Sequence, residues 1–385
     1  MRILHIGHRL PPEPGGKERY IERLVHEQLR RGHGVVLAHR RGNAPHGTEL
    51  LPLTRTAMSR AVSLKSDEIA FAMECAKALR RVRGIDIIHA HGDHRETLHL
   101  GPAARRLGIP LVVHVHGALN TRHRRVMPWA FRDVAGFIVS GTRPAANLLA
   151  AGVPDRLIRS LPAGVDLSRL TAIRDSEQVE RGLIVSVGSL LPVKNHPLTI
   201  AAFHEIQAAH PHARLVIAGS GPERARLERL AGPAVRFTGQ IPPDEVYRLV
   251  SRAEVFVHSS HLLPTIGEGI PTAPLEALAL GAAVVVSSEA SLEPAVIDGA
   301  AYRVFRSGSV ADLARHLRAL LGDDAARRRM VARGVRAASD LDWPLVAGRI
   351  EEWYERLMRT RGTEISMPSY ADALTPGLHA RTRSS

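Results

Sequence analysis

Short apolar runs alternate with longer stretches of helical periodicity along most of this chain. The apolar runs of the first half lie at 2–6, 35–38, 86–89, 111–115 and 136–139. The second half repeats the scheme, with runs at 183–187, 214–218, 235–237, 255–257 and 283–286. This spacing is typical of βαβ units built around a parallel sheet. We therefore predict an α/β protein of two doubly wound, Rossmann-like lobes, with a ligand cleft between them at the carboxyl ends of the strands.

A turn-rich segment from Leu161 to about Glu180 separates the two halves, because it is polar, carries Pro and Gly, and lacks periodicity. Helical periodicity returns near the end of the chain, and the last residues are rich in Ser, Thr, Pro and Arg. The predicted parts are an N-terminal domain at 1–165 joined by a C-terminal helix at 343–360, a C-terminal domain at 181–340, and a disordered tail at 361–385.

Cysteine use and hydropathy suggest where such a chain would reside. A single cysteine, Cys75, excludes an internal disulfide and a cysteine-based zinc site, and it suits a reducing compartment. The apolar stretch at 1–7 is too short for a secretory signal. The longest uncharged apolar run, 277–288, has twelve residues, whereas a membrane span needs about 20. We expect a soluble, cytoplasmic protein.

The chain is strongly basic, with 52 Lys and Arg residues against 38 Asp and Glu residues and a net charge of +14. A nucleic-acid partner would suit this charge, but aromatic residues make up only 4% and are not interleaved with the basic ones as stacking platforms. Residues 1–180 hold 28 basic and 17 acidic residues, so most of the excess belongs to the first half. We expect no nucleic-acid partner. The basic half either faces an anionic membrane or a phosphorylated acceptor, through residues such as Arg55, Arg60 and Arg122–Arg125, or reflects the arginine bias of a GC-rich genome.

Two loops that follow predicted strands are suited to an anion. Gly15 and Gly16 precede a helix, where backbone N–H groups and the helix dipole favour a phosphate, although a plain glycine loop would have the same residues. Lys194 follows Gly188 and Ser189 at the start of another helix, and it is the only lysine of the second half. It either binds a phosphate or lies solvated on the surface. Neither loop matches a Walker P-loop or a G-x-G-x-x-G fingerprint.

The segment 254–288 carries two glutamates in unusual settings. Glu268 lies in a glycine-containing loop after a strand, and Glu276 lies in the first turns of a short apolar helix. Burying a carboxylate among apolar neighbours is costly unless it is paired or hydrogen-bonded. Each glutamate therefore either accepts hydrogen bonds from ligand hydroxyls or forms a salt bridge in the core.

Histidines gather at the ends of two predicted strands, as His89, His91 and His94 and as His114 and His116. Residues i and i+2 of a strand share a face, so a metal site is one interpretation and a polar role in the ligand cleft is another. We favour the second, because a chain with 21 histidines brings pairs together by chance. Asp340 and Asp342 form a D-x-D sequence between two helices, where a helix cap is the expected role.

Taken together, these motifs resemble the retaining glycosyltransferases of family 4, also called glycosyl transferases group 1, which have the two-lobed GT-B fold. The match extends to about residue 360, and its most specific part is the spacing from Glu268 to Glu276 with Gly281 behind it. The remaining motifs occur in the expected order at 12–16, 31–33, 86–91, 113–117, 162–166, 187–196, 218–223 and 237–239.

The resemblance implies roles for the matched residues. Glu276 would hold the ribose hydroxyls of a nucleotide sugar, Lys194 with the Gly15–Gly16 backbone would hold the diphosphate, and Glu268 would contact the donor sugar. The loop after Gly239 would meet the base through its main chain. The implied catalytic residues are His116 and Glu268; the implied donor-binding residues are Gly15, Gly16, Ser189, Lys194, Gly239, Ile241, Gly269, Ile270 and Glu276; the implied acceptor residues are His91, Asp93 and His94.

The resemblance also implies the activity. A hexose or amino-hexose would pass with retention from a UDP- or GDP-linked sugar to a hydroxyl acceptor, without a metal ion or another cofactor. The acceptor would be a lipid-linked glycan or polysaccharide precursor, with peripheral contact at the inner membrane face, or else a small secondary metabolite. A sugar-nucleotide epimerase or a phosphorylase of the same fold is the alternative. Where the family often has Arg after Val-Gly this chain has Ser189, so half of the diphosphate clamp is missing or supplied elsewhere, with Arg9 as a candidate.

A second departure lies before and after Glu268. The loop at 261–267 looks long, and Pro271 and Pro274 remove two N–H donors that could have met a phosphate.

Overall fold

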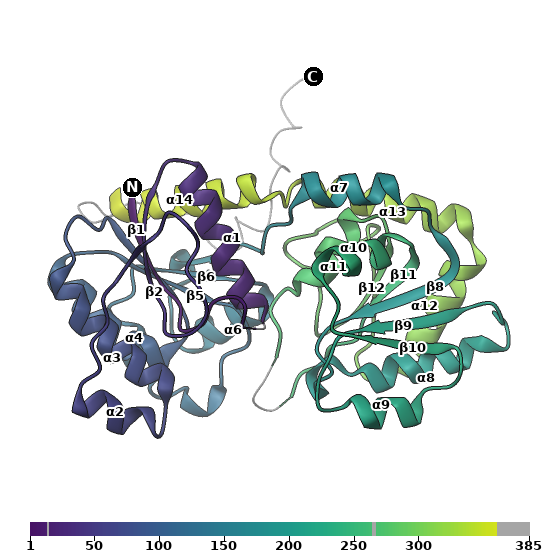
Figure 1. Ribbon diagram of the computed structural model, residues 1–385, viewed down its shortest axis with the longest axis horizontal. Coiled ribbons are helices and arrows are strands. Elements are labelled where there is room, and N and C mark those ends of the chain that lie inside the picture. The colour runs from purple at the N-terminus through teal and green to yellow at the C-terminus, as the bar shows by residue number, and fades with distance from the viewer. Residues whose placement is uncertain (14, 264–266, 360–385) are drawn as a thin grey trace, which may run out of the picture. The chain divides into compact units, whose positions relative to one another are not determined.

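The computed structural model describes residues 1–13, 15–263 and 267–359, which form two compact units (Figure 1). Unit 1 comprises Met1–Pro162 and the C-terminal helix α14 (Trp343–Arg359), and unit 2 comprises Ala163–Asp342. The predicted tail at 361–385 lies outside the described residues. None of the helices in the described ranges is both long and apolar enough to cross a membrane.

Unit 1 is built on a parallel sheet with the strand order β3-β2-β1-β4-β5-β6-β7. Its strands are β1 (Arg2–Ile6), β2 (Gly34–Ala38), β3 (Glu49–Leu50), β4 (Ile87–His91), β5 (Leu111–Val115), β6 (Gly136–Val139) and β7 (Ile158–Ser160). Its helices are α1 (Gly16–Arg30), α2 (Ala57–Ser63), α3 (Asp67–Ala78), α4 (His94–Leu107), α5 (Met127–Phe131), α6 (Thr142–Ala150) and α14, with short 3₁₀ turns at Leu79–Arg81, Thr121–His123 and Asp155–Leu157. Strands covered on both faces read as nearly continuous apolar runs, which is why the sequence reveals them.

Unit 2 repeats this design with the strand order β10-β9-β8-β11-β12-β13. Its strands are β8 (Glu180–Val187), β9 (Arg214–Ala218), β10 (Val235–Gly239), β11 (Ala253–His258), β12 (Ala283–Ser287) and β13 (Arg303–Phe305). Its helices are α7 (Leu167–Ser176), α8 (His196–Gln207), α9 (Arg224–Leu230), α10 (Pro243–Ser251), α11 (Thr272–Ala279), α12 (Val310–Gly322) and α13 (Asp324–Ser339), with a 3₁₀ turn at Pro192–Lys194. Two hydrophobic clusters, one around Phe256 and one around Phe203, pack in this unit.

Each sheet has a point where the chain reverses its direction of strand addition. In unit 1 this point lies between β1 and β4, and in unit 2 it lies between β8 and β11. Ligands of doubly wound sheets bind at such switch points, outside the carboxyl ends of the strands. The loop that carries Lys194 follows β8, and the loop that carries Glu268 follows β11. The fold thus brings both predicted donor loops to the switch point of unit 2.

The segment predicted to link the two domains is in part a helix. Residues 163–180 belong to unit 2, and α7 begins where the Asp166 side chain accepts a hydrogen bond from the Arg169 N–H at 3.3 Å. Asp342 Oδ1 accepts a second one, from the Leu167 N–H at 3.3 Å. The segment predicted to separate the two halves thus contains a helix, whose Leu170 is buried and whose Leu167 and Ile173 are half-buried against the core of unit 2. Asp342, the second aspartate of the D-x-D sequence, thus contributes to the cap of α7.

Candidate functional site

Lys194 and Glu268 lie against each other at the switch point of unit 2. Lys194 Nζ donates a hydrogen bond to Glu268 Oε1, and His258 Nε2, at the end of β11, lies 2.8 Å from Glu268 Oε2. Ser260 Oγ lies 2.9 Å from the same histidine nitrogen. Burial works to raise the pKa of Glu268, but His258 and Lys194, which both bond its carboxylate, together hold that pKa well below its ordinary value. Glu268 is therefore an ionised carboxylate that faces a lysine ammonium.

The loop that carries Lys194 is held in place from β11. The 3₁₀ turn ends at Asn195, whose φ of 51° is left-handed, and α8 starts directly after it. Ser259 Oγ donates to the backbone oxygens of Lys194 at 2.8 Å and Asn195 at 3.1 Å. A further bond runs from the His261 N–H to the Val193 oxygen at 2.9 Å. The loop of Lys194 is thus held by Ser259 and His261, which directly follow β11.

Glycines allow three neighbouring loops of unit 2 to approach each other. A Cβ on Gly219 would lie 1.9 Å from the Gly188 oxygen, and Gly219 itself has a φ of 149°. Its N–H donates to the Gly239 oxygen at 3.0 Å. The G-x-G at 219–221 is therefore a tight βα turn, and it joins the loop of Ser189 to the predicted base-binding loop after Gly239. Ser189 itself is exposed.

Glu276 lies in α11 and has a partner that the sequence did not suggest. Tyr247, in α10, donates its hydroxyl proton to Glu276 Oε1 at 2.9 Å. Glu276 is half-buried, as Gly269 is, whereas the Ile270 side chain is only 6% exposed and packs in the hydrophobic core. Ile241 is half-buried against the same core. Ile241, Gly269 and Ile270 can therefore offer a ligand their backbone more readily than their side chains.

In unit 1, α1 begins directly after the Gly15–Gly16 loop, as predicted. The carboxylate of Glu18, which is 7% exposed, lies over this loop, because a Cβ on Gly15 would lie 1.9 Å from Glu18 Oε2. The N-terminus of α1 is thus already close to a negative charge. A phosphate at this loop would require the Glu18 side chain to move.

The predicted residues of the first lobe fall into two groups. His91 Nδ1 and His116 Nε2 lie 3.1 Å apart, so the structure brings these two histidines together. Asp93 caps α4, where it accepts a hydrogen bond from the Arg95 N–H at 2.8 Å and contacts the Arg95 guanidinium at 3.1 Å. His94 Nε2 lies 3.0 Å from His123 Nδ1. A cap explains Asp93 without a ligand.

A buried acid at the start of α4 went unnoticed in the sequence. Glu96 accepts a hydrogen bond from the Asp93 N–H at 2.9 Å and completes a capping box. Burial, with the charge of Asp93, raises the pKa of Glu96 to about 7. The sequence shows the capping-box pattern, an acid three residues after Asp93, but it does not show that the Glu96 side chain is buried.

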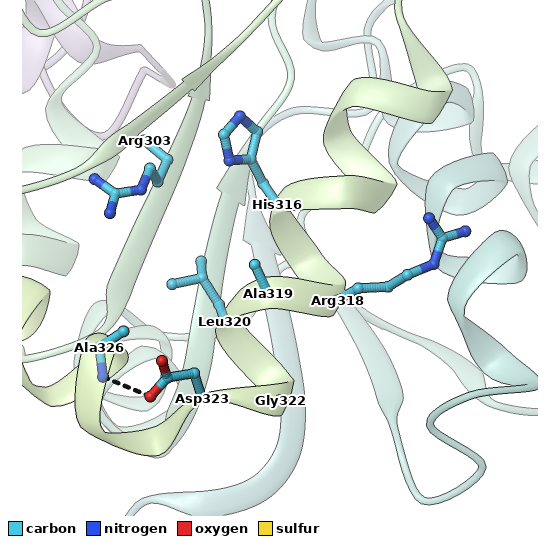
Figure 2. Close-up of a pocket in the computed structure, with 8 residues that line it drawn as sticks. All are labelled: Arg303, His316, Arg318, Ala319, Leu320, Gly322, Asp323 and Ala326. Atoms are coloured by element: carbon cyan, nitrogen blue, oxygen red, sulfur yellow. Dashed lines mark hydrogen bonds between the residues drawn. The ribbon is translucent and has the colours of Figure 1, made fainter.

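One surface pocket of unit 2 holds none of the predicted site residues. This pocket of about 330 Å³ lies between α12, β13 and the start of α13, and Arg303, His316 and Arg318 line it (Figure 2). Asp323, at its lower edge in Figure 2, is engaged as the cap of α13 through the Ala326 N–H. The residues that line this pocket come from the edge strand β13 and from α12 and α13, whereas the switch point lies between β8 and β11. We therefore assign the candidate site to the loops that carry Lys194 and Glu268.

Comparison with known proteins gives the family of each unit. The model named "Glycosyltransferase Family 4" matches residues 14–169, and the model named "Glycosyl transferases group 1" matches residues 171–336. A 2-deoxystreptamine glucosyltransferase of Streptomyces kanamyceticus is 30% identical over 71% of this chain and 78% of its own length. A glycogen synthase of Mycobacterium tuberculosis is 27% identical over 96% of this chain and 97% of its own.

Solved structures agree with this assignment at the level of the fold. Anabaena HepE in complex with UDP has a TM-score of 0.74 at 18% identity and covers 92% of this chain and 100% of its own. The sucrose-phosphate synthase of Thermosynechococcus elongatus has a TM-score of 0.73 at 19% identity, over 93% of this chain and 99% of its own. The chain belongs to the glycosyl transferases group 1, within glycosyltransferase family 4, and has the GT-B fold.

Proposed function

We propose that the protein transfers a hexose or amino-hexose, with retention, from a nucleoside-diphosphate sugar to a hydroxyl acceptor. The observation that carries this proposal is the group formed by Lys194, Glu268 and His258 at the switch point of unit 2. An ammonium, an ionised carboxylate and an imidazole at the carboxyl ends of parallel strands can together bind a diphosphate and sugar hydroxyls.

Each residue of this group has a distinct role in the proposed donor complex. Lys194 exchanges its contact with Glu268 for the donor diphosphate, and its charge stabilises the negative charge that develops on the leaving group. Glu268 stays bonded to His258 and accepts hydrogen bonds from the hydroxyls of the donor sugar. Glu276 binds the ribose hydroxyls, with Tyr247 as the partner that orients its carboxylate.

The acceptor binds on unit 1, where His116 lies close to the reacting carbon in the proposed complex, and His91 and His94 belong to the same region. No residue is assigned as a nucleophile. In the proposed reaction the acceptor oxygen attacks the sugar from the face that the diphosphate leaves, and the departing phosphate takes the acceptor proton. No metal ion or other cofactor contacts the diphosphate in this scheme.

The relatives suggest which donors and acceptors to examine. HepE has been solved with UDP and with UDP-glucose, and a relative from Mycolicibacterium smegmatis is a GDP-mannose-dependent phosphatidylinositol monomannoside mannosyltransferase. UDP- and GDP-linked hexoses are therefore the first donors. A lipid-linked acceptor is favoured by exposed apolar and basic side chains in unit 1, including Leu64 at 90% and Trp129 at 56% exposure. A small hydroxylated metabolite is the second candidate, because the 2-deoxystreptamine glucosyltransferase is a relative at 30% identity.

The test is a donor panel followed by product analysis. UDP, GDP and ADP are compared by calorimetry, and hexoses linked to the base that binds are then offered with lipid and small-molecule acceptors, with and without EDTA. We expect an α-linked product from an α-linked donor and no effect of EDTA. Rapid turnover of donor without an acceptor would favour an epimerase instead, and release of a sugar 1-phosphate from a glycan and inorganic phosphate would favour a phosphorylase. A β-linked product would contradict retention.

A further inference from the structure

Five histidines lie on one face of the sheet of unit 1. His5 is on β1, His89 and His91 are on β4, and His114 is on β5, with His116 just beyond it. The register pairs His5 with His89 and His91 with His114, and residues i and i+2 of a strand share a face. His5, His89, His91 and His114 are each at most 2% exposed. So many polar rings in a protein core call for partners.

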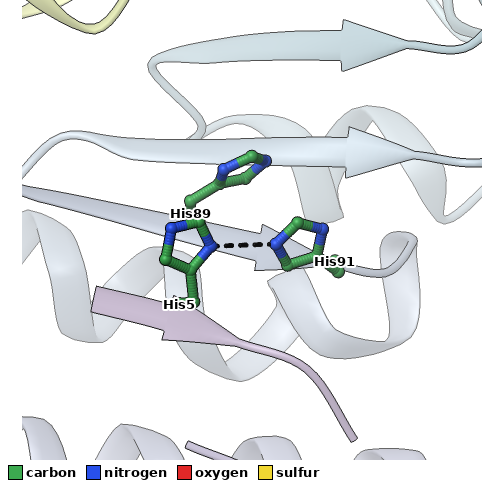
Figure 3. A group of neighbouring side chains, drawn as sticks. All are labelled: His5, His89 and His91. Carbon is green, nitrogen blue, oxygen red and sulfur yellow. Dashed lines mark hydrogen bonds between the residues drawn. The ribbon is translucent and has the colours of Figure 1, made fainter. Parts of the chain in front are cut away.

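Three of these rings converge on one point. His5, His89 and His91 each offer a ring nitrogen, and these nitrogens lie within 4.8 Å of one another. Figure 3 shows the three rings close together on β1 and β4, with His5 Nδ1 3.0 Å from His91 Nε2 and the His89 ring beside them. His89 Nε2 is buried and has no hydrogen-bond partner among the residues that the structure describes. A hydrogen bond between two rings therefore leaves the third one unsatisfied.

The second nitrogen of each ring is held from outside the triad. His5 Nε2 lies 2.7 Å from Gln28 Oε1, His89 Nδ1 lies 2.5 Å from the Tyr354 hydroxyl, and His91 Nδ1 lies 3.1 Å from His116 Nε2. Gln28 comes from α1 and Tyr354 from α14, the helices that cover this face. Metal-binding histidines almost always have their other ring nitrogen fixed in this way, because the outer bond sets the tautomer and the ring orientation.

We propose that His5, His89 and His91 bind one transition-metal ion of the class that prefers imidazole, with Zn²⁺ as its representative. Ligands about 2.0–2.1 Å from such an ion lie about 3.3 Å apart in tetrahedral geometry, close to the His5–His91 separation. The three donors are all imidazole nitrogens, which suit Zn²⁺, Cu²⁺ or Ni²⁺ rather than Mg²⁺ or Ca²⁺.

The ion would cross-link the core of unit 1, and His91, once bound to the ion, would support the His116 ring rather than contact the acceptor itself. The ion would join β1 to β4, which are far apart in the sequence, and so stabilise the native state by mass action. His91, His114 and His116 form a second group with nitrogens within 4.8 Å of one another. It shares His91 with the first, and His116 is only half-buried. We place the ion in the group of His5, His89 and His91, the inner triad, because, in each of these rings, the nitrogen that would not bind the ion already has a hydrogen-bond partner.

The experiment uses the full chain produced in Zn²⁺-supplemented or Co²⁺-supplemented medium, because a buried site is most readily filled during folding. We expect one equivalent of metal per chain after desalting, the visible d–d absorption of imidazole-ligated Co²⁺, and a higher midpoint of thermal unfolding than that of the metal-free protein. A content well below one equivalent, with an unchanged midpoint, would overturn the proposal.

Variants then locate the ion. His89→Gln should abolish metal retention and the Co²⁺ band, and Tyr354→Phe, which removes only a hydroxyl, should weaken binding about 10–100-fold. His212→Ala, at an exposed histidine of unit 2, is the control and should bind as the wild type does. Circular dichroism of each metal-free variant checks folding, and Tyr354→Phe provides the test if His89→Gln does not fold.

Three results would contradict the assignment. Loss of the metal in His114→Gln with retention in His89→Gln would place the ion in the outer group. Loss in His212→Ala would mark an adventitious surface ion. Unchanged retention in both His89→Gln and Tyr354→Phe would exclude the inner triad altogether.

Discussion

At the residue scale, the main result is the ion pair between Lys194 and Glu268. The sequence singled out both residues, each by its local setting, but not their contact, because 74 positions separate them and spacing carries no information across a fold. His258 and Tyr247 were missed for a related reason. His258 ends a strand like many other polar residues, and Tyr247 lies in an amphipathic helix without a motif. Their importance appears only through the carboxylates that they bond.

The hydrogen bond between Tyr247 and Glu276 predicts a graded pair of variants. Glu276→Ala should lower donor affinity about 10–100-fold, because a carboxylate that bonds ligand hydroxyls contributes about 1.5–3 kcal/mol. Tyr247→Phe keeps the ring and the carboxylate, so it should cost less than tenfold. Calorimetric titration with the nucleoside diphosphate measures both. Equal affinity in Glu276→Ala and the wild type would remove Glu276 from the donor site.

The raised pKa of Glu96 predicts a pH dependence of stability. Between the ordinary value of 4.5 and about 7 the folded protein keeps a proton that the unfolded chain has released. The free energy of unfolding should therefore fall as the pH rises through this window. Glu96→Gln can still accept the hydrogen bond of the Asp93 N–H, and its free energy of unfolding should not fall in this pH window. At pH 8 the variant should therefore be more stable than the wild type by on the order of 2 kcal/mol. Urea unfolding at pH 5 and pH 8 measures it, and parallel pH profiles of both proteins would contradict it.

At the scale of elements, most strands were predictable, whereas some helices, α7 among them, were not. Buried parallel strands are apolar runs in the sequence, so each strand of both sheets except the two-residue β3 and the short β7 and β13 had a visible signal. Helix α7 gives a weak signal because only Leu170 is fully buried, while Leu167 and Ile173 are half-buried against the core. Its start is capped by Asp166 and also bonded by Asp342, from the far end of unit 2, which no local pattern could reveal.

The close approach of the β9 turn to the donor loop predicts a sensitive glycine. Gly219→Ala would place a methyl group 1.9 Å from the Gly188 oxygen, so the backbone beside Ser189 must shift. We expect a loss of about 3 kcal/mol or more in the free energy of unfolding. Gly322→Ala is the control, because a Cβ there meets nothing within 4 Å. Chemical denaturation of both variants measures the difference in their free energies of unfolding. Equal values would show that the turn tolerates a side chain at position 219.

At the scale of the whole molecule, two repeated βαβ patterns sufficed to predict two α/β units with ligand loops at the carboxyl ends of the strands, whereas the switch points follow only from the strand order of the structure. The histidine cluster of unit 1 was only half predictable. The pairs at 89–91 and 114–116 follow from strand periodicity, but His5 joins them through the register of β1 with β4. Long-range register of this kind is set by the packing of the complete sheet.

The basic surface of unit 1 predicts binding to anionic membranes. Arg122 and Arg125 are exposed, as are Leu64 and Trp129. Replacing both arginines with Gln should weaken binding to anionic liposomes by about 1 kcal/mol per residue and leave binding to neutral ones unchanged. Arg328→Gln, at an exposed position of unit 2, is the control. Liposome sedimentation measures this, and binding that ignores anionic lipid content would contradict a membrane role.

The most direct test of the proposed donor site is the affinity of the wild type, Lys194→Ala and Lys65→Ala for the preferred nucleoside diphosphate, measured by calorimetry. Lys65 is an exposed lysine of unit 1 and serves as the matched control. Removing Lys194 leaves Glu268 bonded to His258 but unbalanced by a cation, so an anionic ligand is repelled. We predict at least tenfold weaker binding for Lys194→Ala, with Lys65→Ala unchanged. Equal affinities for all three proteins would show that the diphosphate binds elsewhere.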